Sequence, residues 1–380
     1  MTDLIATARG FHDELKRRAP EIEAARRMPA DIANRFNEAG FFRLLVPKDY
    51  GGLESDPVTF AQIAETLAEA DASTAWVTMI CGSTGVIASW ITPEGAREIY
   101  TANNVVCGVF ARRGKAHDEG DHYRVEGKWQ WGSGSDISNW MTAGCVLYRD
   151  GEPVMEGEVP ANGTVFVPTR EVELQGNWDT SGLCGTGSQD FVMRDVRVPK
   201  ARAEFGAFKI HVNRPLYHFP PFGLLACGVT AAMMGAARAS IRELIALASV
   251  KIPEAHRRVL AQRTQTQEHV AEAEATLRSA RAFYYEMMHK TWDETNAKGR
   301  ASTETRRDLR LAITHAARAS VRTVDLMYNL GGGTSVYKTS PLQRIFRDVH
   351  VASQHMQVAT PTMETVGRHM LGIDGDYSQL

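Results

Sequence analysis

The segment GKWQWGSGSDISNW, residues 127–140, decides how the rest of the chain is interpreted. It ends a run in which apolar side chains fall on one face at a period of two: Tyr123, Val125, Trp129 and Trp131. That period is typical of a β-strand with one buried face. Directly after it, Ser133 stands between Gly132 and Gly134, so a hydroxyl lies on backbone that a ligand can approach closely. The segment therefore predicts a strand that ends in a polar turn.

The β texture extends on both sides of this segment. Short runs such as TVFVP (164–168) and DFVMRDVRVP (190–199) are separated by Gly, Asn, Asp and Pro. Before this region, ADIANRFNEAGFFRLL (30–45) predicts one helix that ends near Pro47, and residues 57–90 predict a second. We therefore expect an N-terminal helical domain over residues 1–102 and a central β domain over residues 103–212.

The helical pattern returns after Pro221. Two long stretches place apolar or small residues three or four positions apart: Val270, Ala273, Leu277, Ala280, Phe283 and Met287, then Leu309, Ala312, Ala316, Ala319, Thr323, Leu326 and Leu330. The residues between them, around position 300, read as a polar loop. We expect a helical bundle over residues 213–380 and a chain that is mainly α-helical with a central β domain.

Composition narrows the class of protein. Apolar residues make up 43% of the chain, charged residues 23%, and the net charge is -2, so there is no positive excess to attract nucleic acid. We find no signal peptide and expect no membrane span, which predicts a cytoplasmic protein. The five cysteines are scattered, without the spacing of a metal site, so we expect buried thiols and no metal.

The turn in residues 127–140 has two interpretations. It is a structural strand end, or it is a cradle for a flavin. In the cradle, Trp131 packs on the isoalloxazine ring and the Ser133 hydroxyl bonds the ring near N5, beside Gly134.

The segment GNWDTSGLCGTGSQDF, residues 176–191, allows a similar choice. Taken alone, it is as well explained by a polar β-hairpin turn. Its functional interpretation assigns Trp178, Thr186 and Ser188 to the same cofactor.

A third segment covers residues 325–355. A helix closes at Leu330, and Gly331, Gly332 and Gly333 form a bare-backbone loop suited to a phosphate or to a cofactor of another chain. Pro341 opens the next helix, on which Arg347 and Asp348 are best explained as a structural ion pair. His355, near its end, is as compatible with a core residue as with a catalytic one.

Together these three segments make the chain resemble the acyl-CoA dehydrogenase superfamily over essentially its whole length. The resemblance implies an N-terminal α domain, a central β-barrel or β-sandwich, a C-terminal four-helix bundle, and a homotetramer with flavin near a subunit interface. In the dehydrogenases a glutamate stands at the position that Met356 occupies here, and methionine cannot act as a base. The preceding His355 is similar to the histidine of the flavin-dependent aromatic hydroxylases of that superfamily.

The nucleotide half of the cofactor differs as well. The adenosine anchors of the dehydrogenases are replaced by SVKIPEAHRR (249–258) and by Tyr328-Asn329-Leu330. This favours reduced FMN delivered by a separate NAD(P)H-dependent flavin reductase, with FAD as the alternative. Lys251 is a candidate phosphate contact.

The resemblance implies the oxygenase component of a two-component monooxygenase, which uses O₂ through a C4a-(hydro)peroxyflavin. Ser133 bonds N5, and His355 acts as a base or steers the distal oxygen. Trp90 and Phe110 join His355 around a small aromatic or heteroaromatic substrate. Two alternatives remain: an acyl-CoA dehydrogenase that takes its base from elsewhere, for example Glu364, and a catalytically silent binding protein on the same scaffold.

Overall fold

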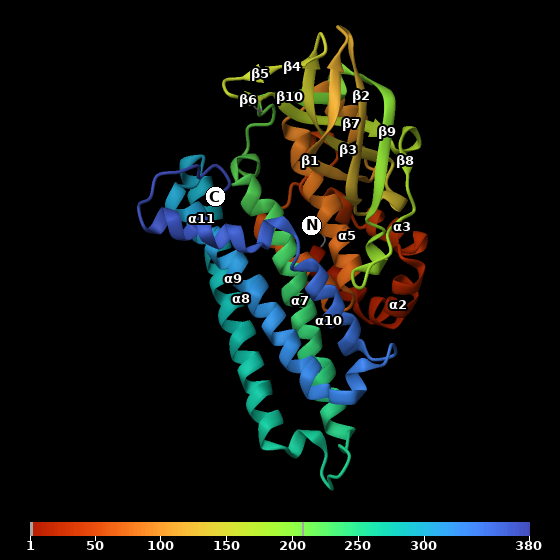
Figure 1. Ribbon diagram of the computed structural model, residues 1–380, viewed down its shortest axis with the longest axis vertical. Helices are drawn as coiled ribbons and strands as arrows, with labels where there is room; N and C mark the ends of the chain where they lie inside the picture. The colour runs from red at the N-terminus through yellow and green to blue at the C-terminus, as the bar shows by residue number, and fades with distance from the viewer. Residues whose placement is uncertain (1–2, 207–208) are drawn as a thin grey trace.

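The computed structural model describes residues 3–206 and 209–380, and it places the β region between two helical parts of the chain (Figure 1). The N-terminal part contains helices α1 (Leu4–Gly10), α2 (His12–Ala25), α3 (Ala30–Glu38), α4 (Pro57–Ala68), α5 (Ala72–Thr84) and α6 (Pro93–Ile99). Short 3-10 turns lie at Phe41–Arg43 (η1), Lys48–Tyr50 (η2) and Gly85–Ser89 (η3).

Both of the helices expected in this part are interrupted. The first ends at Glu38 because Gly40 has a φ of 82°, a left-handed conformation in which a helix does not continue. The second is divided into α4 and α5 because Asp71 turns the chain, and its carboxylate accepts the Thr74 backbone N–H at 2.7 Å. The prediction of helices was correct, but it did not include the two breaks, one at Gly40 and one at the Asp71 cap.

The β region forms one main sheet. Its strands follow the order β10-β7-β3-β1-β2-β9-β8, β4 pairs with β3, and β1 runs parallel to β3. The bounds are β1 (Val106–Asp118), β2 (His122–Gly132), β3 (Trp140–Arg149), β4 (Glu152–Pro153), β7 (Asn162–Pro168), β8 (Glu173–Leu174), β9 (Gln189–Pro199) and β10 (Ala203–Phe205). A separate hairpin joins β5 (Met155–Glu156) to β6 (Val159–Pro160).

The alternation expected for β2 holds at Val125 and Trp129, which are fully buried, but not at Trp131. The register between β2 and β9 shifts between Trp129 and Gly132, so the strand loses its period of two before it ends. Trp131 is 64% exposed and does not join the buried face.

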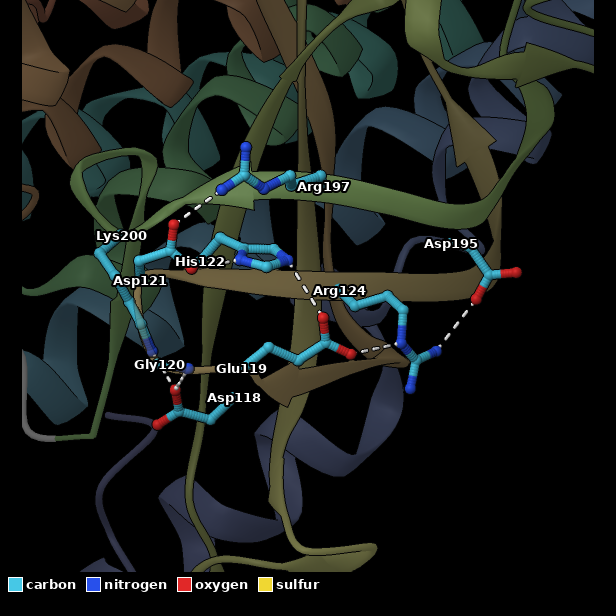
Figure 2. Close-up of polar contacts among 9 residues, drawn as sticks. All are labelled: Asp118, Glu119, Gly120, Asp121, His122, Arg124, Asp195, Arg197 and Lys200. Atoms are coloured by element: carbon cyan, nitrogen blue, oxygen red, sulfur yellow. Dashed lines mark hydrogen bonds and ion pairs between the residues drawn. The ribbon is translucent and has the colours of Figure 1, made fainter.

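A network of charged side chains closes the turn between β1 and β2 (Figure 2). Asp118 accepts hydrogen bonds from Lys200 and from the Gly120 backbone N–H. Beside it, Glu119 and Arg124 form an ion pair at 2.7 Å. The ion pair between Asp121 and Arg197 at 2.7 Å connects the turn to the strand β9, and Lys200 connects it to the 3-10 turn that follows β9.

The C-terminal part is a bundle of α7 (Pro221–Val250), α8 (Thr264–Lys298), α9 (Thr303–Gly331) and α10 (Pro341–Ala352), which run side by side in Figure 1. A 3-10 turn, η11 (Met356–Val358), and the helix α11 (Thr360–Met370) follow. Both long helices and the start at Pro341 agree with the sequence prediction.

Helix α7 connects the bundle to the N-terminal helices through its small residues. A Cβ at Gly235 would lie 2.1 Å from the Glu65 backbone oxygen on α4, so only glycine permits this approach. By length and composition α7 could cross a membrane, contrary to the expectation from the sequence, but 89% of its most apolar window is buried inside the protein. Its hydrophobicity therefore serves the packing of the core.

Candidate active site

At the end of β2 the Trp131 indole is exposed, whereas the Ser133 hydroxyl is buried. Trp131 has a φ of 70°, a conformation that costs a bulky residue free energy and is retained mainly where function requires it. Two residues on, Ser133 is 5% exposed, and its backbone N–H donates to the Trp131 carbonyl at 2.9 Å. Gly134, with a φ of 80°, donates its N–H to the Thr186 carbonyl at 3.0 Å. The turn is therefore fixed against the second predicted segment.

A chain of hydrogen bonds joins the two segments through their side chains. The Trp76 indole Nε1 of α5 donates to the Ser133 Oγ at 3.1 Å. The Ser133 Oγ lies 2.6 Å from the Ser188 Oγ, which lies 2.6 Å from the Thr186 Oγ1. The chain ends at the Leu183 carbonyl, which the Thr186 hydroxyl contacts at 2.8 Å. Three of the predicted site residues are thus joined in one hydrogen-bond chain, although Ser133 lies more than 50 positions before Thr186 and Ser188 in the sequence.

Trp178 supports this cluster from the side. Its indole Nε1 donates to the same Leu183 carbonyl at 3.1 Å, and its own carbonyl accepts from Arg26 at 3.3 Å. In the structure Trp178 therefore stabilises the backbone at Leu183. Its predicted contact with the cofactor stays a prediction.

Helix α10 holds the loop that carries Thr186 and Ser188. The Asp348 Oδ1 accepts the Leu183 N–H at 2.6 Å, and Arg347 donates to the Ser181 carbonyl and pairs with Glu23. The expected ion pair between Arg347 and Asp348 is therefore wrong in its partners, because each residue contacts a different group. Burial raises the pKa of Asp348 to about 7.

His355 packs edge-on against Trp76, with ring centroids 5.6 Å apart at an interplanar angle of 74°. Its Nδ1 accepts the Gln357 backbone N–H at 3.3 Å, so the proton of the neutral ring lies on Nε2. Burial, with the Arg310 cation second, lowers the pKa of His355 to about 4. Near neutral pH, His355 is an uncharged ring with an N–H donor at Nε2.

Arg310 on α9 holds the segment that contains His355. It is 3% exposed and donates to the Gln357 carbonyl at 2.9 Å and to the Thr362 hydroxyl at 3.2 Å. A further hydrogen bond reaches the Phe222 carbonyl at 3.3 Å, and among the described residues Arg310 has no carboxylate partner. Because a buried cation needs its hydrogen bonds, these contacts hold η11 against α9.

A small cavity lies between α5, α7 and α10, next to this cluster. Its volume is about 10 Å³, and its walls are mostly small and apolar: Ala72, Trp76, Leu183, Ala232, Met233, Ala236, Asp348, Val349 and Ala352. A larger hollow of about 430 Å³ beside Trp140 and Arg202 contains none of the predicted site residues. Of these two, the smaller cavity borders the hydroxyl chain, through Trp76 and Leu183.

Lys251, Gly331 and Gly332 meet at the opposite end of the bundle. The Lys251 Nζ donates to the Gly331 carbonyl at 2.6 Å, which caps the last turn of α9. A helix the length of α7 spans roughly 45 Å, and Figure 1 shows its end far from the sheet. Within one chain these residues therefore do not join Ser133 and His355, and their role toward a cofactor stays a prediction.

The remaining predicted residues lie apart from the hydroxyl chain. Phe110 is 37% exposed in the irregular middle of β1, and Trp90 is partly buried at the end of η3. Neither lines the small cavity, so their substrate contacts stay predictions. Met356 is 66% exposed, and Glu364 is exposed on α11. Among the described residues, no group of three or more His, Cys, Asp or Glu side chains could hold a metal ion.

Sequence reasoning missed Trp76, Leu183, Gln357 and Arg310. Trp76 offered a signal, since it is a single large aromatic in the otherwise small and polar run ASTAWVT, residues 72–78. Leu183 and Gln357 act through their backbone atoms, which leave no signature in the sequence.

Comparison with known proteins agrees with this geometry. Residues 2–100 match the model for the acyl-CoA dehydrogenase N-terminal domain, and residues 227–360 match a model for the C-terminal domain. The indole-3-acetate monooxygenase of Pseudomonas putida is 31% identical over 357 residues, covering 93% of this chain and 90% of the relative. The oxygenase subunit HsaA, a flavin-dependent monooxygenase of Rhodococcus jostii, is 28% identical over 90% of this chain and 91% of its own length.

Solved structures share the fold. The 3-HSA hydroxylase from Rhodococcus sp. RHA1 superposes with a TM-score of 0.92 at 23% identity, over 100% of this chain and 99% of that one. XiaF from Streptomyces sp., solved with FADH2, gives a TM-score of 0.89 at 22% identity, over 98% and 95%.

The chain belongs to the acyl-CoA dehydrogenase superfamily. Within it, the chain is an oxygenase component of the flavin-dependent monooxygenase class, in agreement with the fold and function expected from the sequence.

The residues present fit a flavin. Trp131 offers an exposed aromatic face, and the Ser133 oxygen uses only two of its three hydrogen-bonding positions. Trp131 and Ser133 are therefore the residues that would hold the ring. Gly134 is packed against Cys81 and Val77, and its contact with the cofactor stays a prediction.

Proposed function

We propose that this enzyme oxygenates a small aromatic or heteroaromatic substrate with reduced FMN, which a separate NAD(P)H-dependent flavin reductase supplies. FAD is the alternative cofactor, and a homotetramer is the proposed assembly. The observation that carries the proposal is that Ser133 and His355 both contact Trp76, with no carboxylate at the position of Met356.

Reduced flavin, when bound, supplies the electrons that activate O₂. The protein's own part is to hold the flavin and to place two polar groups. Ser133 offers an oxygen toward N5, and His355 offers an Nε2–H donor that can steer an oxygen atom or bind a substrate hydroxyl. Because Nδ1 is already bonded, the donor role is better supported than that of a base.

The small cavity supports a flat, apolar substrate. Ala232, Ala236 and Ala352 leave room beside the Trp76 ring, and none of the lining residues is a cation that would hold a phosphate or a coenzyme. At about 10 Å³ the cavity is far below the roughly 300 Å³ of a typical ligand site, so substrate entry requires side chains to move. The relative from Pseudomonas putida is named for indole-3-acetate, and indoles are therefore the first compounds to test.

The test is a stopped-flow experiment in which protein and reduced FMN are mixed with O₂, with and without indole, indole-3-acetate, phenol or resorcinol. We expect a long-lived near-ultraviolet band that is distinct from oxidised FMN, and hydroxylated product with one of the substrates. Release of hydrogen peroxide as fast with the protein as with free reduced FMN would contradict the proposal.

A matched pair of variants locates the substrate. Ala236→Val should narrow the cavity and lower product formation while reduced FMN still binds. Ala246→Val, on the exposed end of the same helix, should have no effect. Bleaching of oxidised FAD by an acyl-CoA would instead support the dehydrogenase alternative.

A further inference from the structure

The hydrogen-bond chain around Ser133 has a single direction. The Leu183 carbonyl has no hydrogen, so the Thr186 hydroxyl must donate to it at 2.8 Å. A hydroxyl has one hydrogen, so in the next contact, at 2.6 Å, Ser188 donates to Thr186. The same elimination makes Ser133 the donor to Ser188 at 2.6 Å.

The other end of the hydrogen-bond chain occupies one lone pair of the Ser133 oxygen. The Trp76 indole is a donor only, and it donates to the Ser133 oxygen at 3.1 Å. The Ser133 hydrogen is committed to Ser188, and one of its two lone pairs is committed to Trp76. One lone pair remains, so Ser133 can accept one more hydrogen bond and has none left to donate.

This matters for flavin because the redox state changes what N5 presents. Oxidised flavin has a lone pair at N5 and requires a donor, whereas reduced flavin has an N5–H and requires an acceptor. We propose that Ser188 and Thr186 are positioning residues that fix Ser133 as an acceptor and so make the site selective for reduced flavin. The inference rests on the proposed contact between Ser133 and N5, and it adds that oxidised flavin binds more weakly than reduced flavin.

Because the hydrogen-bond chain is buried, the direction of its hydrogen bonds is difficult to reverse. Ser133, Thr186 and Ser188 are 5%, 1% and 3% exposed, so no solvent replaces a broken contact. Reversal would turn the Thr186 hydrogen toward Ser188 and take the hydroxyl donor away from the Leu183 carbonyl, and a buried group that loses a hydrogen bond is costly.

The experiment measures the dissociation constants of oxidised FMN and, under anaerobic conditions, of reduced FMN. The readout is the ratio of the oxidised to the reduced constant. We expect a ratio of about ten or more for the natural protein, the value of one well-placed hydrogen bond. In Ser188→Ala the Ser133 hydroxyl is free to turn toward N5, so the ratio should fall by about tenfold, which corresponds to about 30 mV in the two-electron potential of bound FMN.

Further variants separate direction from stability. Thr186→Val should also lower the ratio, and Thr186→Ser, which keeps the hydroxyl, should restore it. Trp76→Phe removes a bond to the same oxygen but leaves the direction intact, so the ratio should stay unchanged even if both constants rise. Thr142→Val, which removes a buried hydroxyl that pairs with Thr164 elsewhere in the sheet, is the matched control.

Two results would overturn the inference: a ratio near one in the natural protein, or an unchanged ratio in both Ser188→Ala and Thr186→Val when these bind FMN. Failure to bind FMN in either redox state would instead contradict the proposed function. If Thr186→Val does not fold, the comparison of Ser188→Ala with Thr186→Ser decides the question alone.

Discussion

At the scale of single residues, neighbouring groups determine the tautomer and the charge of His355. Gln357 fixes the proton of His355 on Nε2, and Arg310 holds Gln357 from the other side through its carbonyl. The guanidinium also disfavours a second positive charge at His355, which burial already disfavours. His355 is therefore neutral near pH 7 and keeps a nitrogen lone pair at Nδ1, which a protonated ring would lack.

Replacing Arg310 tests this coupling. Arg310→Met should raise the pKa of His355 from about 4 toward, but not to, its ordinary value of about 6.5, because burial remains the larger cause. Arg310→Lys keeps the cation and should leave the pKa low. The measurement is an NMR titration of His355, with His355→Asn to assign its signal. Equal pKa values in both variants would refute the electrostatic part of the argument.

Sequence reasoning reached part of this residue-scale picture. The sequence alone shows hydroxyl residues next to glycines and a histidine beside Met356. These patterns were enough to select Ser133, Thr186, Ser188 and His355. Their connection through Trp76 could not be inferred, because α5 lies nearly 60 positions before Ser133 and only the folded chain brings them together.

At the scale of elements, the loop of residues 176–188 depends on its close contact with α10. A Cβ at Gly182 would lie 2.3 Å from the Arg347 backbone oxygen, and a helix backbone cannot give way. Gly182→Ala should therefore displace the loop, break the bond between Leu183 and Asp348, and weaken FMN binding by at least about tenfold. Ser181→Ala, one position earlier with an exposed side chain, should bind FMN normally in the same fluorescence titration.

The turn between β1 and β2 gives a prediction about acid stability (Figure 2). Lys200 and then Arg149 hold the pKa of Asp118 down at about 2. Because the folded pKa lies below the unfolded value of about 3.9, the contribution is complete at neutral pH and disappears as the pH falls from about 4 to about 2. Asp118→Asn should lower the free energy of unfolding by about 1 kcal/mol at pH 7, allowing for solvent screening, and by progressively less below pH 4.

Urea unfolding between pH 7 and pH 3 measures this difference. Asp121→Asn is the control, since Asp121 belongs to the same network but its side chain is 73% exposed, so its loss should have a smaller effect. An Asp118→Asn effect that is independent of pH would contradict the assignment.

The elements themselves were largely predictable, and the misses have local causes. The long helices of the bundle show their period over many turns, whereas the breaks at Gly40 and Asp71 depend on single backbone or capping contacts. The exposed position of Trp131 depends on a register shift in β2, which a strict alternation of apolar residues does not reveal.

At the scale of the whole molecule, the far end of the bundle exposes a set of apolar residues that we name the end patch: Val250, Ile252, Val336 and Tyr337, each more than half exposed. Exposed apolar residues next to one another are typical of association surfaces. The patch adjoins the exposed Gly332, in the loop whose cofactor role requires a second chain.

We expect a solution mass of about four times the 42.0 kDa of the chain. Tyr337→Glu should shift the protein to smaller species in light scattering and weaken FMN binding in parallel. Val159→Glu introduces the same charge at an exposed position on β6, at the opposite end of the molecule in Figure 1, and should change neither. A monomeric natural protein with full FMN affinity would contradict the proposed tetramer.

The buried helix α7 also has a consequence for synthesis on the ribosome. When Val250 has been added, α4 and α5 are available to cover one side of α7, but α9, which covers another, is complete only at Gly331, about 80 residues later. At roughly 5–20 residues per second this leaves several seconds in which a segment as apolar as a membrane span is only half covered. The nascent chain is therefore a natural client for a chaperone during that interval, and slower translation after Val250 should increase its aggregation.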